Sequence, residues 1–263
     1  MLGGCGQALI SDEYLANQSS RQFSEMKKSQ AVSRNTSDLQ MIRRIGERIV
    51  QVAKVDLPGT RWEFVVFDKA EPNAFAMPGG KVGVNSGLIT LANGNEDEIA
   101  AVMGHEIAHV AFRHGNKRMS QAMGIALGGV ILNTAMRDKS KSDRALAGGA
   151  YGIGSTVGVA LPFSRTQERE ADHRGLFYSA MAGFDPRGAI SFWKKCKVEV
   201  SEECPNFCRL IPILGIVLNF YNPTCIGLLP CIDRPRLPEE RNQIHELITR
   251  FPNRCTQEVC RIP

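Results

Sequence analysis

The chain has 263 residues, of which 43% are hydrophobic and 22% charged, and this composition excludes disordered and collagen-like proteins. The length is sufficient for one domain with a sizeable core, which is the simplest interpretation. The formal net charge is +5, and the basic residues are scattered among acidic ones and do not cluster with aromatic residues. We therefore expect no nucleic-acid partner.

The N-terminus, MLGGCGQ, places Leu-Gly-Gly before Cys5, as in the lipidated cysteine motif of bacterial lipoproteins. Four preceding residues supply neither the basic nor the apolar region of a signal peptide. Two interpretations stay open: residues 1–10 are the late-starting N-terminus of a lipoprotein, or the match is coincidence. In the first, lipidation of Cys5 attaches the protein to a membrane.

Two helices and a small sheet are expected next. A polar helix is predicted over residues 11–30, and an apolar stripe at helical spacing predicts a second helix over residues 35–52. Residues 62–67, rich in aromatic and β-branched side chains, predict a strand. Residues 73–85 predict a β-hairpin that turns at Pro-Gly-Gly.

The segment VMGHEIAHVAFRHG contains the pattern His-Glu-x-x-His. The N-cap Asn95 and the spacing of apolar residues predict a helix over residues 96–118, with His105 and His109 on one face. Two imidazoles one turn apart can bind one zinc ion, and Glu106 beside them can take a proton from a water at the metal. A pair of structural histidines is the alternative until a third ligand is found.

His114 would lie about 180° around this helix from His105, so we interpret it as a structural or surface histidine. A later helix, predicted to end at Gly183, carries Glu168 and Asp172 on one face, whereas Glu170 points elsewhere. One carboxylate could complete a metal site and the other could hydrogen-bond a ligand imidazole. A solvated charged face is the alternative.

Between these helices lie two uncharged stretches, GIALGGVILNTAM and ALAGGAYGIGSTVGVALPFS, joined by the charged link RDKSKSDR. The second approaches the length of a membrane span, but it is rich in Gly and Ala and lacks the Leu and Ile density of one. We therefore favour close-packed helices of small residues over membrane insertion.

Seven of the eight cysteines lie between Cys196 and Cys260, and none forms a Cys-x-x-Cys pair. Disulfides in an oxidising compartment are the favoured interpretation, and a reduced, buried set is the alternative. Residues 196–263 are therefore expected to form a Cys-rich C-terminal segment.

HEIAH, followed roughly 60 residues later by SRTQEREAD, resembles the zinc metallopeptidase family of HtpX, the CAAX prenyl endopeptidase and the periplasmic proteins BepA and LoiP. NAFAMPGGKVGVNSGLI and AGFDPRGAISFWKK agree as well. The resemblance implies an α+β, mainly helical, zincin-like peptidase with a small β-sheet next to the HExxH helix. It places the peptidase domain at residues 11–195, with the segment 196–263 packed on it.

Residue by residue, the resemblance implies a gluzincin site with one zinc ion per chain, bound by His105, His109 and Glu168. It makes Glu106 the general base, which takes a proton from water and passes it to the leaving amine. It also implies that Asp172 orients His105.

Asn73 and Ala74 match the strand whose exposed edge, in zincins, pairs with an extended substrate. Unfolded or extended polypeptides are therefore the implied partners. Such an edge supplies main-chain hydrogen bonds and little sequence specificity.

The resemblance weakens near the C-terminus, where soluble relatives commonly carry His-Pro before an Arg. Here Arg234-Pro235 stands in the His-Pro place, and Arg241 matches the Arg and is expected to face the developing oxyanion. A guanidinium has no lone pair for a cation, so Arg234 cannot bind the zinc as that histidine can. We therefore expect water, and no side chain from this region, as the fourth zinc ligand, and we call this an unlatched site. His245 is expected to pack against other residues or to contact solvent.

The soluble, exported members fit best, which predicts a periplasmic or outer-membrane lipoprotein of a bacterium; another oxidising compartment or a membrane-associated location is the alternative. The predicted function is endoproteolysis of misfolded or unassembled envelope proteins by metal-activated water. The alternative is a chaperone-like binding protein that holds unfolded chains on the edge at residues 73–77 and has a latent zinc site. An intact Glu106 favours the enzyme.

Overall fold

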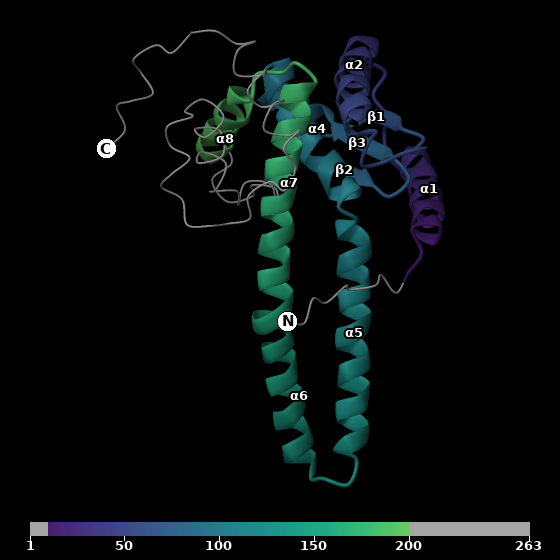
Figure 1. The fold of residues 1–263 in the computed structure, drawn as a ribbon, viewed down its shortest axis with the longest axis vertical. Coiled ribbons are helices and arrows are strands. Elements are labelled where there is room, and N and C mark those ends of the chain that lie inside the picture. The colour runs from purple at the N-terminus through teal and green to yellow at the C-terminus, as the bar shows by residue number, and fades with distance from the viewer. Residues whose placement is uncertain (1–9, 200–263) are drawn as a thin grey trace, which may run out of the picture. The chain divides into compact units, whose positions relative to one another are not determined.

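The structure is a computed structural model that describes residues 10–199 (Figure 1). The chain divides into two units, Met1–Leu210 and Ile211–Pro263, and the described residues all belong to the first. Several positions singled out in the sequence lie outside the described residues: Cys5, Arg234, Arg241, His245 and the cysteines at 204, 208, 225, 231, 255 and 260.

The first two helices, α1 (Asp12–Ser29) and α2 (Thr36–Ala53), begin where polar N-caps predict them. The Asn35 side chain accepts hydrogen bonds from the backbone of two residues in the first turn of α2, which satisfies amides that the helix itself leaves unpaired. The apolar face of α2, including the fully buried Ile42 and Ile45, packs on the sheet and on α4. The predicted stripe is therefore part of the core.

The sheet has three strands in the order β1-β3-β2. β1 (Glu63–Phe67) runs parallel to β3 (Lys81–Asn85), and β2 (Ala74–Met77) forms the predicted antiparallel hairpin with β3. Within the described residues, β2 is thus an edge strand.

The register of the hairpin decides which backbone groups of β2 are free for another chain. The amide of Asn85 donates to the carbonyl of Asn73, so this pair is hydrogen-bonded. Because such pairs alternate along an antiparallel ladder, the N–H and C=O groups of Ala74 and Ala76 point away from β3, toward the free edge.

The core beside the sheet is formed by α3 (Ser86–Leu91), α4 (Glu96–Ala111), α7 (Leu161–Met181) and α8 (Arg187–Glu199). Asn95 caps α4 as predicted. The buried Glu98 carboxylate, three residues further on, accepts hydrogen bonds from Ser191 and Lys195 and so ties α4 to α8.

Two glycines let α4 and α7 approach closely. A Cβ at Gly104 would lie 2.5 Å from the carbonyl oxygen of Gly175, and a Cβ at Gly175 would lie 2.5 Å from the backbone of His105. Any side chain there would push the helices apart.

The prediction of one helix over residues 96–118 is wrong. α4 ends at Ala111, and Arg113 adopts a left-handed conformation (φ 55°) before α5 (His114–Ala135) begins. The break turns α5 away from the axis of α4, so positions in α5 cannot be placed by helical spacing from His105.

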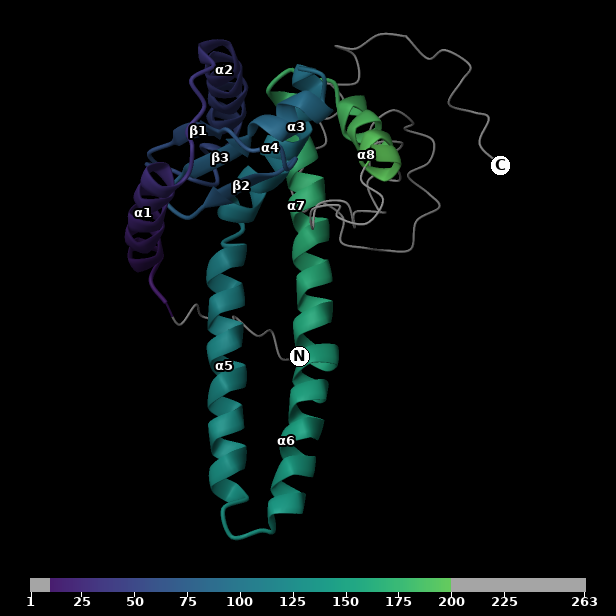
Figure 2. The same ribbon diagram turned by 180° about the vertical axis from the view of Figure 1, so that it is seen from behind.

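The two uncharged stretches form a long helical hairpin, made of α5 and of α6 (Lys141–Ser155) continued through a π-helical turn (Thr156–Ala160) into α7 (Figures 1 and 2). The sequence predicted these helices, but it did not predict how little of their surface is buried. No residue of α6 is buried, and α5 buries only His114 and Asn116 in its first turn, so close packing is limited to the seam between the two arms. Within the described residues, one helix, Lys141–Met181, is long and apolar enough to cross a membrane.

Candidate metal centre

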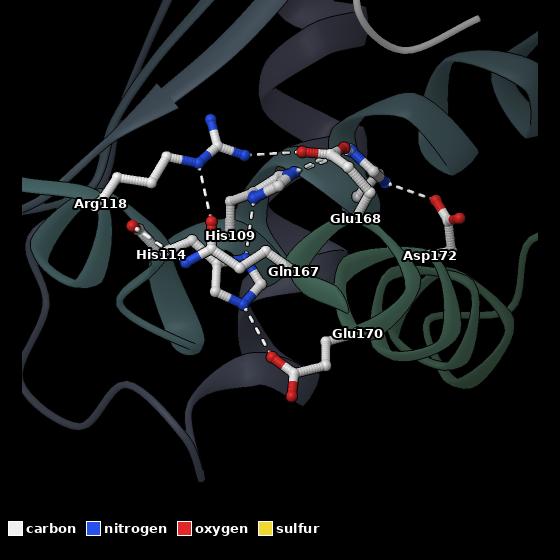
Figure 3. Close-up of polar contacts among 8 residues, drawn as sticks. His109, His114, Arg118, Gln167, Glu168, Glu170 and Asp172 are labelled. Atoms are coloured by element: carbon white, nitrogen blue, oxygen red, sulfur yellow. Dashed lines mark hydrogen bonds and ion pairs between the residues drawn. The ribbon is translucent and has the colours of Figure 1, made fainter. Parts of the chain in front are cut away.

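Three potential ligand atoms converge where α4 meets α7 (Figure 3). The Nε2 atoms of His105 and His109 lie 2.9 Å apart, and each lies 3.5 Å from Oε2 of Glu168. The HExxH helix supplies the histidines one turn apart, and the Gly104–Gly175 contact brings the carboxylate within reach.

Asp172 holds His105 from behind. Its Oδ1 atom lies 2.9 Å from Nδ1 of His105, and both residues are buried. Burial raises the pKa of Asp172. Burial alone would lower the pKa of His105, but the hydrogen bonds to Asp172 and Glu168 outweigh it and raise this pKa to about 9. The pocket around His105 therefore favours positive charge.

A second pair, His114 and Glu170, holds His109 from behind. Nε2 of His114 lies 3.0 Å from the Glu170 carboxylate, and Nδ1 of His114 lies 2.9 Å from Nδ1 of His109. Burial lowers the pKa of His114 to about 4, so its ring is neutral at pH 7 and carries one N–H.

These contacts assign the tautomers. If Nε2–H of His114 donates to Glu170, its Nδ1 atom accepts from Nδ1–H of His109. Nε2 of His109 then carries a lone pair and no hydrogen, and it points at Glu168 and His105. The hydrogen bonds from His109 to His114 and from His114 to Glu170 thus leave Nε2 of His109 available as a metal ligand. Asp172 does the same for Nε2 of His105.

The remaining carboxylate oxygen of Glu168 is held by Arg118, which donates to it over 2.6 Å and to Oε1 of Gln167 over 2.7 Å. Burial would raise the pKa of Glu168, but its interactions with the adjacent His105 and His109 rings lower it overall. Glu168 is therefore ionised at neutral pH and presents one oxygen to the two histidines.

The donor set fits zinc. Two imidazole nitrogens and one carboxylate oxygen form a typical catalytic zinc set, and atoms about 2.0–2.1 Å from a tetrahedral ion are about 3.3 Å apart. The measured separations of 2.9–3.5 Å match this spacing. With the Nδ1 atoms occupied elsewhere, a cation between the converging Nε2 and Oε2 atoms, either a proton or a metal ion, stabilises their close approach.

A cavity of about 410 Å³ opens onto these three residues. Glu106, on the turn between the two histidines, lines it, and so do Asn73, Ala74 and Ala76 of the hairpin. The structure therefore brings together all the site residues predicted within residues 10–199.

His114, Glu170 and Arg118 were missed, and two of them were misjudged. His114 was placed on the far side of a straight helix, but the break at Arg113 rotates it onto His109; Glu170 was expected to point elsewhere and contacts His114. The burial of His114 agrees with the interpretation as a structural histidine, but not with that as a surface histidine. Spacing alone gives no signal for this contact, since five residues on a continuous helix do not share a face.

Comparison with known proteins identifies the class. The family profile described as peptidase family M48 matches residues 36–247. The mitochondrial metalloendopeptidase OMA1 of Schizosaccharomyces pombe is 35% identical over 154 residues, which cover 59% of this chain and 42% of that protein. The β-barrel assembly-enhancing protease of Escherichia coli K12 is 32% identical over 163 residues, covering 59% of this chain and 32% of that protein.

The chain belongs to peptidase family M48, a family of zinc-dependent metallopeptidases, which confirms the resemblance and the mainly helical zincin-like fold. It spans less than half the length of these relatives. The relatives come from mitochondria and from bacteria, so the relationship alone does not assign a compartment.

Proposed function

We propose that this chain is a zinc-dependent endopeptidase, with His105, His109 and Glu168 as ligands. The observation that carries the proposal is the convergence of three lone-pair atoms, each on a residue oriented from behind, at a cavity that Glu106 also lines. The names of the relatives, a metalloendopeptidase and a protease, support the same activity.

Zinc, when bound, supplies a Lewis acid that polarises the scissile carbonyl and makes water more acidic. Glu106 removes the proton from the attacking water and delivers it to the leaving amine. Asp172 and His114 keep the two imidazoles in the tautomers that leave Nε2 free for the metal. Arg241, outside the described residues, is our candidate for facing the oxyanion.

We infer that the substrates are extended segments of misfolded or unassembled proteins of a bacterial envelope. The outward backbone groups of Ala74 and Ala76 lie at the edge of the cavity and can pair with an extended chain, which a folded protein does not offer. The proposal of an oxidising compartment with lipidated Cys5, and of an unlatched zinc, rests on the sequence of residues outside the described range.

The test is to replace Glu106 by Gln and to measure casein cleavage and zinc content. We expect Glu106→Gln to keep one zinc per chain and to lose proteolysis by several orders of magnitude, because no base generates the nucleophile. Glu71→Gln is the matched control, since it removes an exposed carboxylate at the same cavity without touching a ligand. Cleavage that survives in Glu106→Gln, or in wild type after complete chelation, would refute the proposal. Casein binding without cleavage by wild type would favour the chaperone-like alternative.

A further inference from the structure

The helical hairpin has two uncharged arms of matched length. No charged residue occurs among the 18 residues at 119–136 or among the 20 residues at 145–164. At 1.5 Å per residue these helical arms extend about 27 Å and about 30 Å. The hydrocarbon core of a lipid bilayer is about 30 Å thick, so both arms are long enough to cross it. The helix that carries the second arm, Lys141–Met181, is also apolar enough to do so.

The arms show apolar side chains on their outer surfaces. Leu127 and Ile131 in α5 are each 61% exposed, and Leu146 and Ile153 in α6 are 76% and 69% exposed. Helices of a water-soluble domain turn such residues inward, and a helix that is apolar all round is either buried or surrounded by lipid. The exposed large apolar residues of the two arms are Met119, Met123, Leu127, Val130, Ile131, Leu146, Ile153, Val157, Val159 and Leu161.

The seam between the arms uses small residues and an internal hydrogen bond. The hydroxyl of Tyr151 donates to the carbonyl of Ile125 over 2.8 Å, and Gly128 leaves room for it, since a Cβ there would lie 2.2 Å from that hydroxyl. The hydroxyls of Thr134 and Thr156 likewise donate to carbonyls within their own helices. Internal pairing of this kind is what a medium without water requires.

Charges delimit both ends of the arms. Lys117 and Arg118 precede the first arm and Arg165 follows the second, all near the peptidase core, while the connecting tip at 137–144 carries four basic and two acidic residues. We propose that the hairpin inserts into a lipid bilayer as two antiparallel spans, with the metal centre held at the membrane surface. This proposal departs from the sequence-based preference for close-packed helices over membrane insertion, and it is independent of the proposed proteolysis.

A second copy of the chain is a poorer fit than lipid. An interface between copies covers one patch, whereas exposed apolar residues here occur along both arms, from Met119 to Ile131 in the first and from Leu146 to Leu161 in the second. Lipid surrounds a helix pair on all sides and needs no complementary patch.

The experiment uses the full chain, purified in mild detergent and reconstituted into phosphatidylethanolamine–phosphatidylglycerol vesicles. We expect it to stay with the vesicles through alkaline carbonate extraction. External trypsin should leave one protected fragment from Met119 to Arg165, because the basic residues of the tip lie across the bilayer and are cut only after detergent is added.

Leu127→Lys/Ile153→Lys places one charge at the centre of each arm and should lose vesicle association, since a charge at that depth opposes insertion. Tyr14→Lys/Val55→Lys is the matched control. It changes two exposed apolar residues outside the hairpin in the same way, and it should remain bound to the vesicles. Circular dichroism in detergent shows whether each variant is folded. Wild-type chain that carbonate removes, or a tip cut without detergent, would overturn the proposal, as would a detergent-free soluble dimer that the hairpin variant dissociates.

Discussion

At the scale of single residues, the metal centre depends on side chains that do not touch the metal themselves. His114 accepts from His109 and donates to Glu170, which fixes the nitrogen that faces Glu168. We expect His114→Ala to weaken zinc binding about 10- to 100-fold, as is usual when such an orienting partner is lost. Competition with a chromophoric chelator measures this directly.

The two variants of Glu170 separate positioning from general damage. Glu170→Gln keeps an oxygen that can accept from His114 and should retain most of the zinc affinity, whereas Glu170→Ala should behave like His114→Ala. Glu25→Ala, on the exposed face of α1, serves as control and should leave affinity unchanged. Equal affinities for His114→Ala and wild type would show that the contact has no positioning role.

The sequence predicted the residues whose chemistry is tied to local spacing. His105 and His109 are one turn apart, and Glu168 and Asp172 are one turn apart, so each pair could be placed on a helix face without knowing the fold. Arg118, by contrast, contacts a residue 50 positions away, and no local rule could give that contact.

At the scale of helices, the approach of α4 to α7 sets the geometry of the site. Gly175→Ala should separate the helices, because its Cβ would meet the backbone of His105 at 2.5 Å, and both zinc affinity and stability should fall. Overpacking of this kind costs about 1–3 kcal/mol. Thermal denaturation and chelator competition are the measurements.

Gly149→Ala is the matched control for that variant. Gly149 lies in α6 with no atom within 4 Å of the added methyl group, so the change should raise stability by roughly 0.5–1 kcal/mol through helix propensity. A Gly175→Ala protein as stable and as zinc-avid as wild type would rule out a requirement for close helix contact.

The edge strand offers a different test at this scale. Ala76→Pro removes an N–H that points toward the free edge, so we expect KM for extended peptides to rise while zinc affinity is unchanged. Ala76→Val keeps the N–H and should retain the wild-type KM. An increase in KM for both variants would point to side-chain crowding rather than backbone pairing.

Most helices and strands could be predicted because their ends carry local signals. Ser11, Asn35 and Asn95 cap helices, and Gly183 ends one. The break at Arg113 carries no such signal, because Arg is a good helix former and the strained conformation costs about 1 kcal/mol or more. The strained conformation persists because contacts of the residues that follow stabilise it: His114 is buried against His109, and the Asn116 side chain donates to the carbonyl of Ile10.

At the scale of the whole molecule, the hairpin and the metal centre are separable. Beyond its first turn α5 buries no residue, and α6 buries none, so we expect that replacing residues 122–160 by a short Gly-Ser linker leaves zinc affinity within about 2-fold of wild type. The same variant should no longer bind vesicles. Loss of zinc together with the hairpin would show that the arms support the site.

The sequence-based interpretation of the arms rested on composition. Their high Gly and Ala content favoured close-packed helices of small residues, but composition does not show which other elements lie nearby. Only the fold shows that the two arms contact each other and leave Leu127, Ile131 and Ile153 uncovered.

The order of ligands along the chain has a consequence for how the proposed membrane form can be made. His105 and His109 precede the hairpin and Glu168 follows it, yet all three must end in one compartment. The number of crossings between residues 109 and 168 is therefore even, and a chain in which one arm alone had entered the bilayer would leave its carboxylate on the opposite side from its histidines. An intermediate with only one arm in the bilayer cannot complete the metal site. The protein would then be inactive throughout its biosynthesis and would become a protease only when the second crossing is finished.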